Sequence, residues 1–254
     1  MHPILLKIGP FTIYSYGLMI ALGFAIAIFL ACRRAHLFGL NADRIIDLAV
    51  FLLLGGIIGA RVFYILLNLN YYKINMFEAI DLTKGGLVWY GGFAAALLVL
   101  IWYIKKNKIK FWPVADFMAP YVALGEAFGR IGCLLNGCCY GREASAGYPS
   151  GIIFPGESVI RYPTQIYSSV ILLLIFMILR LWQERRHFAG EIFLGYCALY
   201  SMKRFFIEFL RGDNPQIMLG LTISQIISVI VFVLAVAIFT QKKTKWRMGI
   251  SKSK

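Results

Sequence analysis

Seven apolar stretches, each of roughly 18 or more residues, constrain this chain more than any other feature of its sequence. They lie near residues 11–32, 45–68, 86–104, 112–129, 164–182, 190–209 and 219–240. An α-helix rises 1.5 Å per residue, so about 20 apolar residues cross the hydrocarbon core of a bilayer. No remaining stretch is long enough for a second domain. The sequence therefore predicts an all-α, polytopic membrane protein with seven transmembrane helices and a single domain over residues 1–254.

The basic residues are concentrated in every second segment between these stretches. A net charge of +14 would suit nucleic-acid binding, but the positions of the charges argue against it. Cytoplasmic loops of membrane proteins are enriched in Lys and Arg, so the alternation predicts an N-terminus outside and a C-terminus in the cytoplasm. We expect no nucleic-acid partner and some attraction to anionic membrane lipid. The clusters are Arg33, Arg34 and Arg44; Lys105, Lys106, Lys108 and Lys110; Arg180, Arg185 and Arg186; and Lys242, Lys243, Lys245, Arg247, Lys252 and Lys254.

The motif GRIGCLLNGCCYG, residues 129–141, follows the fourth apolar stretch. In the predicted topology the outer segments are residues 70–86, about 130–163, and 211–220. The motif, which combines one arginine with three cysteines, is therefore expected at the outer leaflet. That side of a membrane is oxidising, so disulfides persist there.

Several ionisable residues fall inside the predicted spans. An arginine at the centre of a membrane helix costs about 2.5–3.5 kcal/mol on insertion scales, so such residues usually have a function. Arg204 and Glu208 are four residues apart on one helix face, and either form a simple ion pair or belong to a cationic pocket for a phosphate. We favour the pocket, formed with Arg61 and Arg130, because guanidinium groups donate paired hydrogen bonds to phosphate. The other ionisable residues are Asp116, Glu126 and Lys203, with Arg211 continuing the row after Glu208.

Seven motifs along the chain, including the one at residues 129–141, resemble in sequence and order those of the prolipoprotein diacylglyceryl transferase family. The motif at 129–141 is similar to the family signature Gly-Arg-x-Gly-Asn-Phe-x-Asn-Gly-Glu-x-x-Gly. The resemblance covers nearly the whole chain, and the family also has seven spans with the N-terminus outside. The other blocks are IGPFTIYSYGLMIALGF, GGIIGARVFYILLN, GGLVWYGG, ADFMAP, RYPTQIY and RFFIEFLR.

The resemblance implies a transferase of the bacterial cytoplasmic (inner) membrane, multi-pass, with its active site toward the outer leaflet. Such enzymes move the diacylglyceryl group of phosphatidylglycerol to the thiol of a lipobox cysteine in a prolipoprotein and release glycerol phosphate. The resemblance also implies that Arg130 and Arg204 bind the phosphate and that Glu208 orients Arg204. Tyr16 and Asn136 would line the headgroup site. No cofactor is implied.

The sequence departs from the family pattern where proton transfer is expected. The family's histidine before Gly-Gly is Tyr90 here, its signature asparagine is Cys133, and its signature glutamate is Cys138. Tyr90 is therefore the counterpart of a catalytic residue. A Cys138 thiolate, favoured by the nearby charge of Arg130, could replace the carboxylate as base or nucleophile. Gly91–Gly92 either allow close helix packing or leave room for a lipid headgroup beside Tyr90.

The three clustered cysteines, Cys133, Cys138 and Cys139, allow other interpretations. A disulfide from Cys133 to one of the other two would staple the turn after the fourth span. Zinc is disfavoured because the spacing C-x4-C-C is poor for a structural site and because His36 and His187 are predicted on the cytoplasmic side. We therefore expect no metal.

The resemblance leads us to expect a diacylglyceryl transferase that acts on phosphatidylglycerol and a prolipoprotein. Two alternatives remain open. One is a non-catalytic or thiol-redox membrane protein that retains the lipid pocket. The other is a transferase with a different acceptor.

Overall fold

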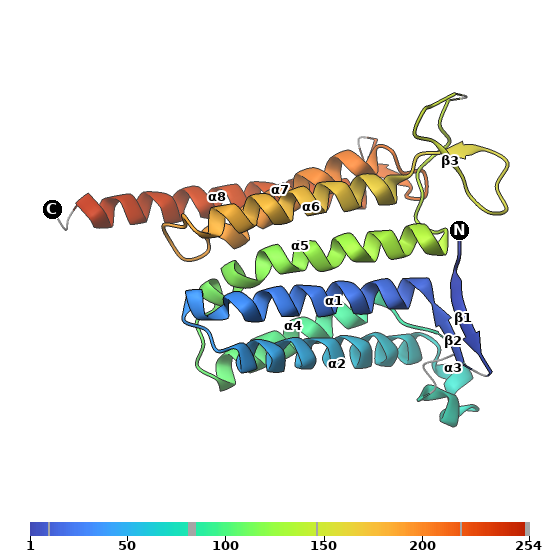
Figure 1. Cartoon of the computed structure of the whole chain (residues 1–254), viewed down its shortest axis with the longest axis horizontal. Helices are drawn as coiled ribbons and strands as arrows, with labels where there is room; N and C mark the ends of the chain where they lie inside the picture. Colours follow the sequence, from blue (N-terminus) through green and yellow to red (C-terminus); the bar gives the residue numbers. More distant parts are fainter. Residues whose placement is uncertain (10, 81–84, 146, 219, 252–254) are drawn as a thin grey trace. The chain divides into compact units, whose positions relative to one another are not determined.

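Long helices account for most of the chain in the computed structural model, which describes residues 1–254 except 10, 81–84, 146, 219 and 252–254. Lys252 and Lys254 of the predicted basic tail, and parts of all three predicted outer segments, lie outside the described residues. Each long helix corresponds to one of the apolar stretches (Figure 1). They are α1 (Ser15–Arg34), α2 (Ala42–Leu67), α4 (Trp89–Lys106), α5 (Phe111–Asn136), α6 (Thr164–Gln183), α7 (Glu191–Glu208) and α8 (Ile223–Ser251).

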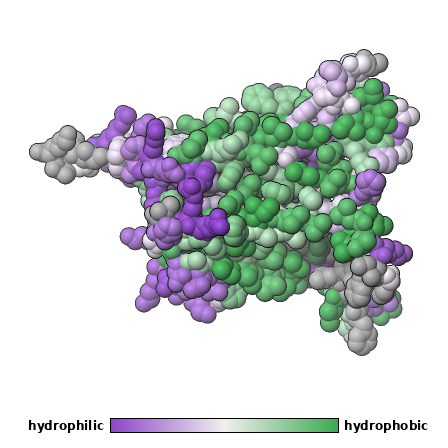
Figure 2. All heavy atoms as spheres, in the orientation of Figure 1, coloured by the Kyte–Doolittle hydropathy of each residue, from purple (hydrophilic) through white to green (hydrophobic). Residues whose placement is uncertain are grey.

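Four of these helices, α1, α2, α6 and α8, are long and apolar enough to cross a membrane. Hydrophobic residues cover the middle of α6, α7 and α8 (Figure 2). Hydrophilic residues gather over the α6–α7 connection and the C-terminal part of α8, where the basic clusters near 185 and 245 lie. The chain is thus a multi-pass membrane protein, while seven spans and the orientation of the termini stay predictions.

The described residues also form three short antiparallel hairpins, so the chain predicted as all-α is mostly rather than wholly helical. They are β1 (Ile4–Ile8) with β2 (Phe11–Tyr14), β3 (Ile152–Ile153) with β4 (Ile160–Arg161), and β5 (Gln216–Met218) with β6 (Leu221–Thr222). Each strand has at most five residues, too few for a clear apolar–polar alternation in the sequence. Short helical turns complete the connections: α3 (Leu69–Tyr72) and the 3-10 helices Ala35–Phe38 and Met76–Ala79.

The chain forms two compact units. One comprises Met1–Leu30 with Trp112–Lys254, and the other comprises Ala31–Phe111. The larger unit contains most of α1 with α5, α6, α7 and α8, and the smaller contains α2 and α4. A single functional domain over residues 1–254 stays a prediction.

Glycines bring α2 and α4 into close contact in the smaller unit. A Cβ on Gly59 would lie 2.1 Å from the Cβ of Ala95, and one on Gly91 would lie 2.2 Å from the Cβ of Phe63. A Cβ on Gly92 would lie 3.0 Å from the carbonyl oxygen of Gly56. Gly91 and Gly92 are therefore occupied by helix packing, and the alternative that they leave room for a headgroup is wrong.

A buried carboxylate joins α5 to α7 in the larger unit. Asp116 is fully buried and accepts hydrogen bonds from the backbone N–H groups of Gly190 at 2.6 Å, Ile192 at 3.0 Å and Phe193 at 2.9 Å. The first N–H groups of a helix have no partner within the helix, so this carboxylate caps α7 and also complements its dipole. The charge noted in the sequence thus has a structural role. Beside it, α5, α6 and α7 share a core of Ala119, Ala123, Ala127, Leu172, Ile175, Leu179 and Ile192.

The close packing of α2 on α4 predicts that Gly59→Ala destabilises the protein. The added methyl group cannot be accommodated without moving the helices apart, so the free energy of unfolding should fall by about 1–3 kcal/mol. Reversible unfolding in detergent, followed by circular dichroism, measures this change. Gly125→Ala on α5 is the control, because its added Cβ meets no described atom within 4 Å. Equal stability of the two variants would contradict the packing.

Candidate active site

A carboxylate in the second half of α5 gathers three side chains around it. Glu126 Oε1 accepts hydrogen bonds from Arg130 Nη2 at 3.1 Å, Lys203 Nζ at 3.1 Å and Tyr200 OH at 3.4 Å. The Lys203 side chain is only 2% exposed. A buried ammonium is stable only when it is paired, so Glu126 makes the burial of Lys203 possible. The i,i+4 spacing of Glu126 and Arg130 is a signal in the sequence for their pairing. The contacts of Glu126 with Tyr200 and Lys203 of α7 have no such signal.

A second carboxylate holds Arg204 on α7. Arg204 Nη2 lies 3.1 Å from Glu208 Oε2 and donates to Ser224 Oγ at 2.8 Å. Glu208 is buried, and its Oε1 accepts from Asn214 Nδ2 at 2.7 Å and Thr222 Oγ1 at 2.9 Å. The predicted pairing of Arg204 with Glu208 is therefore present. Asn214, just before β5, and Thr222 of β6 hold the Glu208 carboxylate in place. Glu208 in turn positions Arg204.

Arg211 lies beyond the end of α7 and does not extend the predicted row. Its Nε donates to Asp213 Oδ1 at 2.9 Å, and its Nη2 contacts Asp213 Oδ2. This pairing lowers the pKa of Asp213 below its usual value. Arg211 is therefore engaged in its own loop.

The guanidinium groups of Arg130 and Arg204 retain free hydrogen-bonding capacity. Their side chains are 22% and 23% exposed. Among the described residues each donates through Nη2, which leaves further N–H groups on each for another acceptor. The charges of both arginines act on Tyr200, so they lie around one part of the larger unit. Two partly exposed guanidinium groups held by carboxylates are a suitable site for a phosphate.

Arg61 has a different environment from the one predicted. It is buried on α2, in the smaller unit, and donates to backbone carbonyl groups. These are the carbonyls of Glu78 at 2.6 Å, Ala79 at 2.9 Å, Gly85 at 2.6 Å and Gly86 at 3.2 Å. The guanidinium thus clamps the segment that leads into α4, which explains its burial without a lipid.

The other predicted lipid-site residues divide between the two units. Tyr16, in the first turn of α1, packs beside Gly132 of α5, where an added Cβ would lie 3.1 Å from Tyr16 Cδ2. The charge of Arg130 also acts on Tyr16. Asn136 is the exposed last residue of α5. Tyr90 belongs to the smaller unit, in the first turn of α4, and is 73% exposed.

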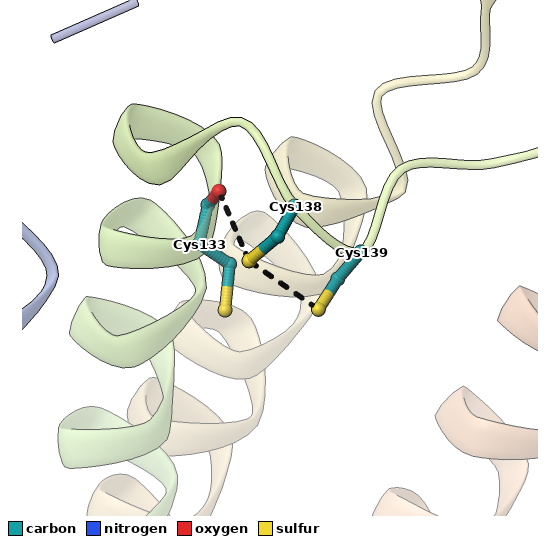
Figure 3. A group of neighbouring side chains, drawn as sticks. All are labelled: Cys133, Cys138 and Cys139. Atoms are coloured by element: carbon teal, nitrogen blue, oxygen red, sulfur yellow. Dashed lines mark hydrogen bonds between the residues drawn. The ribbon is translucent and has the colours of Figure 1, made fainter. Parts of the chain in front are cut away.

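The three cysteines of the motif converge on one another (Figure 3). Their sulfur atoms all lie within 4.8 Å of one another, and Sγ of Cys138 lies 3.6 Å from Sγ of Cys139. All three are free thiols. The turn that brings them together ends α5: Gly137, with φ +72°, donates to the carbonyl of Leu134, and Cys138 N–H donates to the carbonyl of Cys133. This is the Schellman pattern of a helix end, for which the Asn-Gly pair is a sequence signal.

The pKa values of the two cysteines on this turn shift in opposite directions. Burial raises the pKa of Cys138 above its usual value, whereas the charge of Arg130 was expected to lower it. A hydrogen bond from Cys133 lowers the pKa of Cys139 to about 5, with help from Cys138 and the positive charges of Arg211 and Arg130. The thiol of Cys139 is therefore the one that ionises most readily on the turn.

The fold and this site define a helical membrane protein with two arginines available to an anion and a cluster of three thiols. The family model for prolipoprotein diacylglyceryl transferase matches residues 3–241. The chain belongs to this family. Proteins named phosphatidylglycerol–prolipoprotein diacylglyceryl transferase are similar to it along most of both chains.

One such relative, from Clostridium tetani, is 33% identical over 247 residues, which cover 94% of this chain and 97% of the relative. One from Lactiplantibacillus plantarum is 34% identical over 242 residues, covering 91% and 86%. One from Bacillus cytotoxicus is 35% identical over 255 residues, covering 94% and 92%.

The contacts of Glu126 predict that Glu126→Gln destabilises the protein strongly. The substitution leaves the Lys203 ammonium buried without a counter-charge, which costs about 3–5 kcal/mol. Unfolding in detergent measures the loss. The control is Glu184→Gln, which removes a largely exposed partner of Arg180 and should cost at most about 1 kcal/mol. Adding Lys203→Met to Glu126→Gln should restore stability, and a double variant no better than Glu126→Gln would contradict the pairing.

Proposed function

We propose that this chain transfers the diacylglyceryl group of phosphatidylglycerol to the thiol of a lipobox cysteine in a prolipoprotein, with release of glycerol phosphate. The observation that carries the proposal is the pair Arg130 and Arg204. Each is held by a carboxylate four residues away and keeps N–H groups for a further acceptor. The names of the relatives give the same activity and the same two substrates.

The chemistry requires positive charge at the departing phosphate. The acceptor sulfur displaces a phosphate ester oxygen at a glyceryl carbon, so negative charge increases on the leaving group. Preorganised donors aimed at such a charge are often the largest contribution to catalysis. In the proposed mechanism Arg130 and Arg204 bind the phosphate, and Glu126 and Glu208 position them.

The remaining predicted residues have supporting roles in this proposal. Tyr16 and Asn136 line the headgroup site from α1 and the end of α5. Tyr90 stands where the resemblance places the family's histidine, and it remains our candidate catalytic residue in the smaller unit. Arg61 has a structural role in the smaller unit, where it binds the carbonyl groups of Glu78, Ala79, Gly85 and Gly86.

The thiol-redox alternative rests on the convergence of Cys133, Cys138 and Cys139. Two of these thiols could form a disulfide on the outer side of the membrane. A transferase assay separates the two functions, because thiol–disulfide exchange releases no glycerol phosphate.

The two arginines predict the kinetic behaviour of variants. Arg130→Ala and Arg204→Ala should each lower the rate of transfer from phosphatidylglycerol to a lipobox peptide by about 10²–10³-fold, as loss of one such donor typically does. Glu208→Gln should also lower the rate, through Arg204. Mass spectrometry of the peptide and quantification of glycerol phosphate measure the reaction.

Arg180→Ala is the matched control, since Arg180 pairs with Glu184 on α6, away from this cluster. It should retain the wild-type rate. If Arg130→Ala and Arg204→Ala are also fully active, the transferase mechanism proposed here is wrong.

We further propose seven spans in the bacterial inner membrane, with the N-terminus and the site toward the outer leaflet. The basic residues at the ends of α1 and α4 support this orientation. The five native cysteines are first replaced by serine, because the free thiols of the cluster would themselves react. In whole cells an impermeant maleimide should then label a cysteine introduced by Ser150→Cys and should not label one introduced by Asp43→Cys. Labelling at position 43 from outside would contradict the topology.

A further inference from the structure

The cysteine cluster has the geometry of a metal-binding site. In a tetrahedral zinc site with Zn–S bonds of about 2.3 Å, neighbouring sulfur atoms are ~3.8 Å apart. The sulfur atoms of Cys133, Cys138 and Cys139 lie within 4.8 Å of one another and turn toward a common space (Figure 3). Small side-chain rotations bring them to the required spacing. The C-x4-C-C spacing, an argument against zinc in the sequence, is thus compatible with a common ion once the turn is formed.

The backbone around the cluster is fixed by neighbouring groups. Thr164 Oγ1 donates to the carbonyl of Cys139 at 2.9 Å, and Gln165 Nε2 donates to the carbonyl of Cys138 at 2.7 Å. Thr164 and Gln165 are 2% and 1% exposed, so these hydrogen bonds are protected from water. Cys139 has a φ of +64°, a left-handed conformation that a cysteine rarely adopts. Such outliers persist where the surroundings enforce them, and they are concentrated at functional sites.

The donor set has three ligands and an open position. In the described part of the chain, no other histidine, cysteine or carboxylate joins the group formed by Cys133, Cys138 and Cys139. Catalytic zinc sites have three protein ligands and leave the fourth position to water or substrate, whereas structural sites have four. Three thiolates and one Zn²⁺ carry a net charge of −1, and the positive charges of Arg130 and Arg211 act on this cluster.

We propose that Cys133, Cys138 and Cys139 bind a zinc ion whose fourth position takes the thiol of the acceptor cysteine. The acceptor step rests on the transferase function proposed above. Metal coordination deprotonates a thiol, and a metal-bound thiolate is a nucleophile at neutral pH. The zinc ion thereby keeps the acceptor sulfur ionised without a separate general base.

The reaction is balanced without a redox partner. The acceptor thiol displaces a water molecule from zinc and releases its proton to solvent. Its sulfur forms a bond to the glyceryl carbon that carries the phosphate ester, and the carbon–oxygen bond breaks. The oxygen and the bonding electron pair leave with glycerol phosphate, which Arg130 and Arg204 stabilise. The thioether product is a weak ligand, and water replaces it.

Cobalt(II) binding to the full-length protein tests the metal site independently of activity. The protein is purified in detergent, reduced, stripped with a chelator and titrated with Co²⁺, whose thiolate complexes have intense near-ultraviolet charge-transfer bands. We expect one equivalent to bind and Zn²⁺ to displace it. Cys133→Ser, Cys138→Ser and Cys139→Ser should each weaken binding at least ~100-fold, since even partners outside the ligand set contribute 10–100-fold. The cysteines outside the cluster provide controls: Cys32→Ser and Cys197→Ser should bind as wild type. A reduced wild-type protein without the thiolate–cobalt band overturns the proposal.

The acceptor position is tested by adding a lipobox peptide to the cobalt-loaded protein. A peptide with its cysteine should strengthen the charge-transfer band, and the same peptide with serine should not. An unchanged band overturns the acceptor step. Transfer at the wild-type rate by metal-free protein overturns the role of zinc but leaves the transferase function standing. The converse, normal metal and peptide binding without transfer from phosphatidylglycerol, contradicts the transferase function and leaves the metal site standing.

Discussion

Two carboxylates on α5 hold α7 in register, and the arrangement of the site depends on them. Asp116 accepts three backbone N–H groups at the start of α7, and Glu126 binds Lys203 further along the same helix. Both contacts are costly to break, because each would leave a buried charge or unpaired backbone groups. With α5 and α7 fixed in this way, Arg130 and Arg204 are placed by the backbone rather than by flexible side chains. Preorganisation of this kind is what catalysis at a phosphate requires.

The site combines a cationic half with a thiol half. In the cationic half, the Arg204–Glu208 pairing expected from sequence spacing is present. The thiol half contains the clustered side chains of Cys133, Cys138 and Cys139. These thiols are brought together by a helix end and tied to the start of α6. The larger unit thus contains both a cluster of thiols and a cluster of cations. This combination suits a reaction in which a sulfur atom attacks a carbon and a phosphate ester leaves.

Local features of the fold and site could be predicted from the sequence, and long-range contacts could not. The positions of the long helices follow from apolar stretches, and the Arg204–Glu208 pair follows from i,i+4 spacing. The contact of Glu126 with Lys203 joins residues 77 positions apart, for which spacing gives no signal. The contacts of Arg61 could not be predicted for the same reason, because its carbonyl partners lie on a connection with no regular sequence pattern.

The cysteines show a different limit of the sequence. The spacing of the three cysteines argued against a shared metal ion. Spacing alone does not reveal the left-handed residues that fold the turn back on α5 and bring the sulfur atoms together. Gly137 and Cys139 both have positive φ, and the second of these could not have been expected from its residue type. The identity of the ionisable thiol, Cys139 rather than Cys138, likewise follows from hydrogen bonds that form only in the folded turn.

In the proposed transferase, Arg130 and Arg204 bind the phosphate of the lipid substrate. Solid-state NMR measures this directly, as dipolar dephasing of the phosphatidylglycerol ³¹P signal by ¹⁵N-labelled arginine side chains in lipid nanodiscs. We predict dephasing for the wild-type protein that is lost in the double variant Arg130→Lys/Arg204→Lys and retained in Arg180→Lys. Dephasing that is equally strong in the double variant would show that the phosphate binds elsewhere, and it would contradict this account of the site.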